Sequence, residues 1–149
     1  MELNLKGKHI FSIARLISKM NVKKEIKDFF KAYTNNAKKK TNATLKLRLA
    51  LGDLEATAKN VEKVCLENKE LDKELSEVQE QQQDLILDIA FFILEKASNG
   101  EEEIFKILAD MYGVSYEEYK ELGFNEMLES IFKVIKNEEI QQGFLSIFK

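Results

Sequence analysis

Residues 84–97 have the sequence DLILDIAFFILEKA, in which ten of the fourteen side chains are apolar. A helix that is apolar on nearly every side must be covered on nearly every side. The stretch is too short to cross a bilayer, which takes about 20 apolar residues, and Asp84, Asp88 and Glu95 interrupt it. We therefore expect residues 84–97 to form the central helix of a small all-α bundle, with the other helices packed around it.

The composition of the whole chain indicates one all-α domain, residues 1–149. Hydrophobic residues make up 44% of the chain and charged residues 33%; there is no Pro, and Gly occurs six times. Because Pro is absent, Gly and Asn must end the helices. The first ten residues lack the apolar core of a signal peptide, and a lone cysteine, Cys65, cannot form an internal disulfide. These features predict a cytoplasmic protein.

Charge is divided unevenly along the chain. Residues 1–48 hold thirteen Lys and Arg against three acidic residues, a balance of +10, so the remaining residues carry −13 of the net charge of −3. Such polarity indicates either that the two halves neutralise each other in the fold or oligomer, or that the basic half binds a polyanion. We favour neutralisation, because a larger acidic half would repel nucleic acid.

Helical periodicity predicts the elements before the central helix. Residues 8–20 and 22–33 carry apolar faces, and Asn21 separates them. Residues 34–42, TNNAKKKTN, lack apolar periodicity and are predicted to be a polar loop. Residues 44–51 alternate like a strand but are rich in Leu, which favours a helix. A heptad-like pattern then continues to Ile89, with an irregular spacing between Cys65 and Leu71 that fits either one helix with a stammer or a helical hairpin.

The C-terminal third is punctuated by strong helix signals. Gly100 and Gly113 bound a predicted helix over 101–112, and Ser115 with Glu118 forms a capping box for a short helix over 116–121. Asn125 is expected to cap the next helix, and Asn137 to separate it from the last segment, EEIQQGFLSIFK. Several short helices are therefore expected after residue 100.

No constellation of catalytic or cofactor-binding residues is evident, so we expect a protein that is not an enzyme and has no cofactor. The single histidine, His9, is expected at the surface, and no metal-ligand spacing surrounds it. Cys65 lies on the apolar seam, where a small buried hydrophobe is expected rather than a nucleophile. The glycines are scattered singly and form no phosphate-binding loop.

Three features are candidates for binding a partner. The acidic segment 53–82 could project as a helical arm that binds a partner or self-associates through the seam of Leu71, Leu75 and Val78. The apolar chain end, with Phe144 and Phe148, either docks on the core or enters a partner's groove. A basic face of lysines is the third candidate; its members are Lys23, Lys24, Lys27, Lys31, Lys38, Lys39 and Lys40.

Two stretches resemble a known family. LKGKHIFSIARLISKMNVKKEIKDFFK (5–31) is similar to the opening, and EEEIFKILADMYGVSYEEYKELGFNEMLESIFKVIKNEEIQQGFLSIFK (101–149) to the ending, of the tail assembly chaperones of long-tailed phages and prophages of Gram-positive bacteria. The resemblance implies a non-enzymatic protein of the bacterial host cytoplasm that coats the tape measure protein, recruits tail tube subunits and is expected to form a homo-oligomer. No membrane partner is implied. Leu71, Leu75, Val78, Phe144 and Phe148 would be the contacts.

The alternative is a small phage-encoded regulator or inhibitor of host defence. Such a protein would use its basic N-terminal half against nucleic acid or a nucleoprotein, although the lysines lack the interleaved aromatic side chains that stack on bases. For this reason a nucleic-acid partner is the less favoured expectation.

Overall fold

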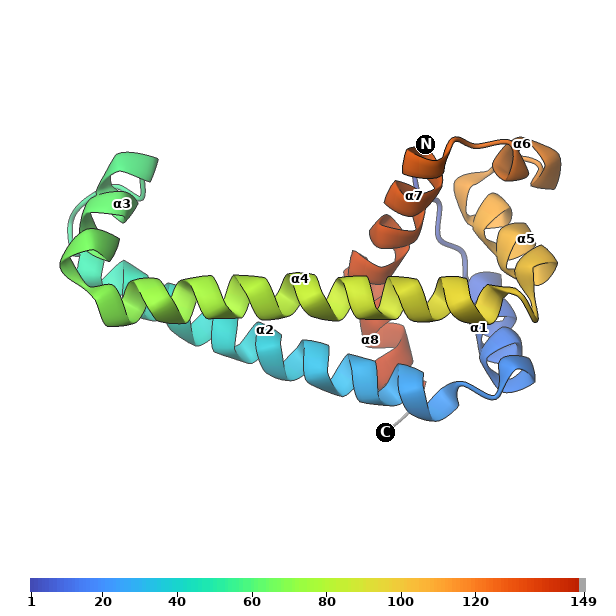
Figure 1. The fold of residues 1–149 in the computed structure, drawn as a ribbon, viewed down its shortest axis with the longest axis horizontal. Coiled ribbons are helices and arrows are strands. Elements are labelled where there is room, and N and C mark those ends of the chain that lie inside the picture. Colours follow the sequence, from blue (N-terminus) through green and yellow to red (C-terminus); the bar gives the residue numbers. More distant parts are fainter. Residues whose placement is uncertain (148–149) are drawn as a thin grey trace. The chain divides into compact units, whose positions relative to one another are not determined.

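The protein is all-α, as its sequence predicts. The computed structural model describes residues 1–147, and this part of the chain forms eight helices and no strand. In chain order the helices are α1 (Gly7–Met20), α2 (Lys23–Leu51), α3 (Ala58–Glu67), α4 (Lys69–Ala97), α5 (Glu101–Tyr112), α6 (Tyr116–Lys120), α7 (Phe124–Lys136) and α8 (Glu138–Ile147). The four short helices that follow residue 100 confirm the expectation for the C-terminal third (Figure 1).

The chain divides into two compact units, and the expectation of a single domain stays a prediction. Unit 1 comprises residues 1–30 and 86–149, and unit 2 comprises residues 31–85. The long helices α2 and α4 each contribute one end to unit 1 and the rest to unit 2. The predicted arm, residues 53–82, lies wholly within unit 2.

The predicted polar loop over residues 34–42 is wrong, because these residues are helical in the middle of α2. Lysine is a good helix former, and Thr41 finds a partner for its hydroxyl in the carbonyl oxygen of Ala37, 3.1 Å away. Asn36 and Ala43 are buried against the rest of unit 2. Contacts with the rest of unit 2 therefore stabilise this segment as a helix, although its sequence has no apolar periodicity.

Within unit 2, α2 and α4 run antiparallel and side by side (Figure 1). The side-chain amide of Asn36 donates to the carbonyl oxygen of Val78 (3.1 Å), and Lys46 pairs with Glu74 (2.7 Å). Gly52, with φ +58°, helps end α2 in the left-handed conformation that glycine adopts readily. Residues 44–82 are therefore neither one helix nor a simple hairpin, because a third helix, α3, follows α2 and precedes α4 in the sequence.

The core of unit 2 is small. Leu51, Val64 and Leu71, one residue from each of α2, α3 and α4, are buried together. Leu47, Val61 and Leu75 pack against this cluster. Asn68 separates α3 from α4, and its side-chain oxygen accepts a hydrogen bond from the backbone N–H of Leu71 (3.1 Å). This break explains the irregular heptad spacing between Cys65 and Leu71.

Unit 1 is a bundle in which α5 packs against α1 and α6, and α7 packs against α8. Its helix ends follow local signals. Asn21 ends α1 with φ 55°, and Gly113 ends α5 with φ 67°; the predicted Ser115–Glu118 capping box is present at α6. One expected cap is wrong: α7 begins after Gly123, whose backbone N–H donates to Glu126 (3.2 Å), so Asn125 lies inside the helix.

A buried polar network joins three C-terminal helices of unit 1. The Tyr112 hydroxyl on α5 donates to the carbonyl oxygen of Ser130 on α7 (2.7 Å). The Tyr119 hydroxyl on α6 is hydrogen-bonded to the Ser130 hydroxyl, which also donates to the carbonyl oxygen of Met127 (2.7 Å). Because each hydroxyl has a partner, these buried groups escape the penalty for unsatisfied polar atoms.

Raising the pH above 10 is expected to destabilise unit 1 through Tyr112. Burial, followed by the nearby Tyr119 and Glu129, raises the pKa of Tyr112 from 10.0 to about 12. The tyrosine hydroxyl loses its proton at a lower pH in the unfolded chain than in the folded chain. The free energy of unfolding is therefore unaffected below about pH 10 and falls as the pH rises to about 12, by up to about 3 kcal/mol. Urea denaturation across this range measures the loss. Tyr112→Phe should remove the part of the loss that is due to Tyr112, while Tyr119, whose pKa burial also raises, contributes the rest. An unchanged pH dependence in Tyr112→Phe would contradict the assignment.

Ion pairs between lysines and carboxylates connect the basic first part of the chain to the acidic remainder. Lys8 pairs with Asp110 (2.6 Å) and Lys19 with Glu103 in unit 1, whereas Lys46 pairs with Glu74 in unit 2. The hydrogen bond that Lys8 donates lowers the pKa of the Asp110 carboxyl, and the positive charge of Lys8 lowers it further by a smaller amount. These contacts agree with neutralisation of the two charged halves within the fold.

Candidate functional site

The expectation that residues 84–97 are covered on nearly every side is wrong. Ile86, Ile89 and Ala90 of α4 are buried in unit 1, but large apolar side chains on another face of the same helix are exposed. These are Leu87, Phe91 and Leu94, with exposed fractions of 45%, 68% and 37%. Their spacing of four and three residues places them along one line of the helix. We call these three residues the α4 stripe; the central position of the helix stays a prediction.

Acidic residues border the α4 stripe. Asp84 lies three residues before Leu87, Asp88 directly follows Leu87, and Glu95 lies four residues after Phe91. All three are exposed. The surface therefore combines an aromatic centre with a negatively charged edge, which is a combination suited to protein recognition.

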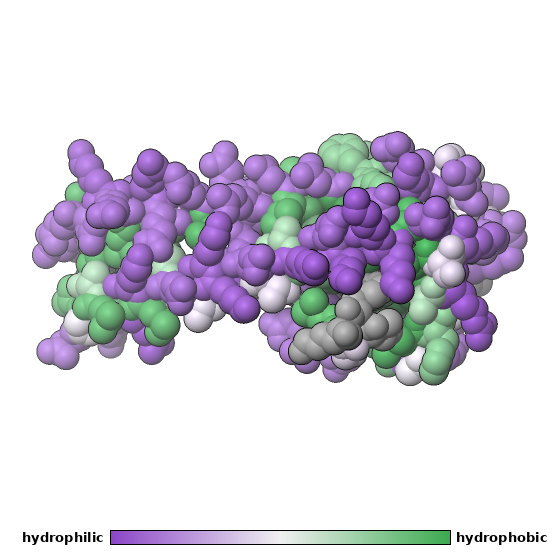
Figure 2. All heavy atoms as spheres, turned by 90° about the horizontal axis from the view of Figure 1, so that it is seen from below, coloured by the Kyte–Doolittle hydropathy of each residue, from purple (hydrophilic) through white to green (hydrophobic). Residues whose placement is uncertain are grey.

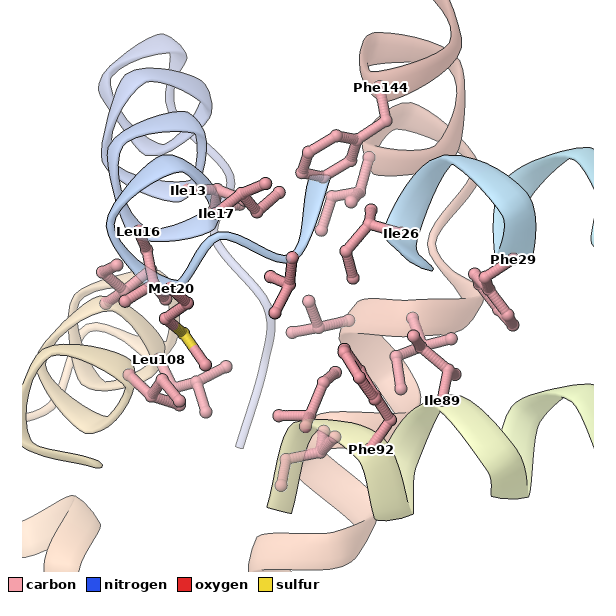
Figure 3. A pocket seen from close by; sticks show the side chains of 18 of the residues that line it. Ile13, Leu16, Ile17, Met20, Ile26, Phe29, Ile89, Phe92, Leu108 and Phe144 are labelled. Atoms are coloured by element: carbon pink, nitrogen blue, oxygen red, sulfur yellow. The ribbon is translucent and has the colours of Figure 1, made fainter. Parts of the chain in front are cut away.

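An apolar cavity of about 140 Å³, partly open to solvent, lies in unit 1. Figure 3 shows side chains from α1, α2, α4, α5 and α8 that point into it. Phe144 of α8 lines the cavity and stacks on Phe30 of α2, with ring centroids 5.2 Å apart. Every lining residue is apolar: Ile13, Leu16, Ile17, Met20, Val22, Ile26, Phe29, Phe30, Ile89, Phe92, Ile93, Ile104, Ile107, Leu108, Met111, Ile131, Val134, Ile135, Ile140 and Phe144.

His9 is buried rather than at the surface, where the sequence interpretation placed it. Its exposed fraction is 2%. Nδ1 accepts from the backbone N–H of Lys6 (2.9 Å), so the ring proton must be on Nε2, which donates to Asp110 (3.2 Å). His9 thus joins the start of α1 to α5. Both ring nitrogens are engaged in the fold, so His9 has a structural role.

The partner contacts predicted from the sequence are placed inside the fold. Leu71 and Val78 are buried in unit 2, and Leu75 is half-buried against the same cluster. Phe144 is buried in unit 1, as expected if the chain end docks on the core, and Phe148 lies outside the described residues. The Leu71–Leu75–Val78 seam therefore packs on its own chain and is not presented to a partner in this structure.

The candidate basic residues are all on α2 but are divided between the units. Lys23, Lys24 and Lys27 belong to unit 1, and the other four belong to unit 2. All are exposed except Lys27, which is half-buried. Lys40 lies 3.4 Å from the side-chain oxygen of Gln82. These side chains are accessible to solvent, which leaves the nucleic-acid alternative as a hypothesis.

Cys65 is poorly suited to nucleophilic chemistry. It is half-buried on α3, and burial, followed by the charge and hydrogen bond of Asp72, raises the pKa of its thiol. A raised pKa lowers the fraction of the reactive thiolate. Within residues 1–147, no three His, Cys, Asp or Glu side chains are grouped so that they could hold a metal ion.

Other apolar side chains are exposed singly or in small groups. In unit 2, hydrophobic residues gather at the end that carries the α2–α3 turn (Figure 2), where Leu45, Leu49 and Leu66 are exposed. In unit 1, Phe124 at the start of α7 is exposed by 75%. Sequence reasoning missed the α4 stripe, although the acidic residues that recur through 84–97 were a signal that one side of this helix meets water.

No protein-family model, curated protein or solved structure matches the chain. The resemblance to tail assembly chaperones therefore rests on residues 5–31 and 101–149 alone. Among residues 1–147, no helix has both the length and the apolar character that a membrane span requires.

Proposed function

We propose that this protein is a non-enzymatic chaperone that binds a helical segment of a client protein on the α4 stripe. The observation that carries the proposal is the exposure of Leu87, Phe91 and Leu94 on one line of a helix whose opposite face is buried in unit 1. Scattered exposed leucines are ordinary on protein surfaces. An aromatic side chain that lies in line with two leucines, beside charged residues, is typical of a binding surface.

The stripe specifies the chemistry of the client. Two turns of helix suit a short amphipathic helix that lays its own apolar face against Phe91. Burial of the Phe91 side chain would contribute about 1.5–3 kcal/mol, so it is the expected anchor of the contact. Because Asp84, Asp88 and Glu95 border the stripe, the client helix is expected to carry Lys or Arg beside its apolar face.

The resemblance supplies a particular client. Tape measure proteins are long helical clients, and a tail assembly chaperone coats them and recruits tail tube subunits. A protein with this role would act in the cytoplasm of the bacterial host and would be expected to form homo-oligomers. The support for this assignment is the pattern of helix ends and core residues in 5–31 and 101–149, together with an exposed apolar surface.

Phe91→Asp is expected to weaken client binding at least tenfold, because the substitution removes the anchor and adds a charge to an acidic border. The measurement is co-purification with a co-expressed tape measure protein, followed by calorimetry on the isolated pair. Phe124→Asp is the matched control, since Phe124 is exposed to a similar extent in unit 1 but lies on α7. Equal binding by the wild type, Phe91→Asp and Phe124→Asp proteins would contradict the proposed surface.

A regulator that binds nucleic acid remains the second candidate, and the observation in its favour is the exposure of six of the seven candidate lysines. This function predicts a salt-dependent shift of labelled DNA or RNA, because each lysine that neutralises a phosphate releases counterions. Replacement of Lys38, Lys39 and Lys40 together by Gln should then abolish the shift.

A further inference from the structure

The apolar cavity of unit 1 has walls that cannot easily close. Twelve of its twenty lining residues are Ile or Val, and all but Val22 lie within helices. Branching at Cβ leaves such a side chain essentially one χ1 conformation in a helix. Because six helices contribute to the wall, rotation of one side chain to another rotamer cannot close the space.

Water is a poor occupant of this cavity. A buried water normally makes about three hydrogen bonds to polar groups, and the side chains of the wall are hydrocarbon or thioether throughout. Apolar cavities of about 150 Å³ lined by Leu, Ile and Phe remain dry and admit benzene or xenon. The cavity in unit 1, at about 140 Å³, has a similar volume and a similar lining, and it differs in being partly open to solvent, which gives a ligand a way in.

We propose that this cavity is a binding site for a small uncharged hydrocarbon group, aliphatic or aromatic. Four rings line it, from Phe29, Phe30, Phe92 and Phe144, and aromatic rings attract one another edge to face or offset. Met20 and Met111 add flexible, polarizable side chains that adapt to the shape of a ligand. The site does not depend on the α4 stripe, so it holds whether or not the proposed client is correct.

A second cavity of about 160 Å³ lies beside the apolar cavity and has a more polar lining. It shares Ile13, Met111, Ile140 and Phe144 with the apolar cavity, and it is also lined by Lys6, His9 and Glu139. Ile140 and Phe144 belong to α8, so this helix forms a wall common to both cavities.

Benzene and xenon are the probes for the apolar cavity. Titration of the full-length protein, followed by methyl NMR, should give saturable shifts at Met20 and Met111, and benzene should raise the melting temperature. Leu108→Ala enlarges the cavity and should increase the affinity for benzene. Val134→Phe fills the cavity and should reduce the affinity at least tenfold, whereas Val61→Phe, on α3 in unit 2, should leave it unchanged.

The proposal is overturned if neither probe produces saturable shifts at the cavity methyl groups of the wild type and of Leu108→Ala. Equal benzene binding by wild type and a folded Val134→Phe variant would overturn it as well. If Val134→Phe fails to fold, the comparison of the wild type with Leu108→Ala decides the question. The effect of Phe91→Asp on client binding tests only the proposed function, and benzene binding tests only the cavity, so either proposal can be wrong while the other is correct.

Discussion

Tyr119→Ala is expected to lower the free energy of unfolding of unit 1 by about 3–5 kcal/mol, as removal of a buried aromatic ring does. Tyr119 has no exposed surface. Its ring centroid lies 5.7 Å from that of Phe105 and 6.4 Å from that of Tyr112, and its hydroxyl is bonded to Ser130. It is also the buried residue of α6, a helix of five residues that is too short to persist without tertiary contacts. The substitution should therefore release α6 as well as leave a cavity.

Chemical denaturation followed by circular dichroism measures this effect. Tyr116→Ala is a matched control, because Tyr116 is on the same helix but only half-buried, and we expect it to cost about 1 kcal/mol or less. Tyr119→Phe should cost about 1 kcal/mol, the net contribution of its hydrogen bond. Equal losses for Tyr119→Ala and Tyr116→Ala would show that α6 is not held by Tyr119.

Leu71→Ala is expected to unfold α3 locally. Leu71 is buried between Leu51 and Val64 in the small core of unit 2, and removal of a buried leucine costs about 2–5 kcal/mol. Val64 is the buried residue of α3, so this helix has few other contacts to offset the loss. Unit 1 has its own core and should remain folded.

Amide hydrogen exchange separates local from global unfolding. Protection in Leu71→Ala should fall in α3 and in the flanking ends of α2 and α4, and should persist in α5 and α7. Leu66→Ala is the control, since Leu66 is on α3 and 71% exposed, and its protection should match the wild type. Uniform loss of protection across the chain would indicate that the two units unfold together.

Helix ends could be predicted from the sequence where a local signal fixes them. Asn21, Gly113 and the Ser115–Glu118 pair act through their own backbone conformation or hydrogen bonds, which neighbouring residues alone decide. The continuation of α2 through residues 34–42 depends instead on burial of Asn36 and Ala43 in unit 2. No pattern along the chain records such a long-range contact.

The candidate site was harder to predict, because apolar residues of one helix look alike in the sequence. Periodicity shows that Phe91 and Phe92 point in different directions but not which of them is covered. In the fold Phe92 lines the cavity and Phe91 faces water. The burial of His9 could not be predicted for a similar reason, since its hydrogen-bond partner Asp110 lies about a hundred residues away in the sequence.

Asn36 has a consequence for how unit 2 tolerates change in length. Its side-chain oxygen is buried without a hydrogen-bond partner in the described part of the chain, which costs stability. A buried asparagine between helices is nonetheless known to fix their alignment. Here the Asn36–Val78 contact is flanked by Tyr33–Gln82 and Lys46–Glu74. A single residue inserted into α2 between Asn36 and Lys46 would bring one of these pairs into conflict with the others. Evolution of the α2–α4 pair in unit 2 should therefore accept substitutions more readily than insertions or deletions.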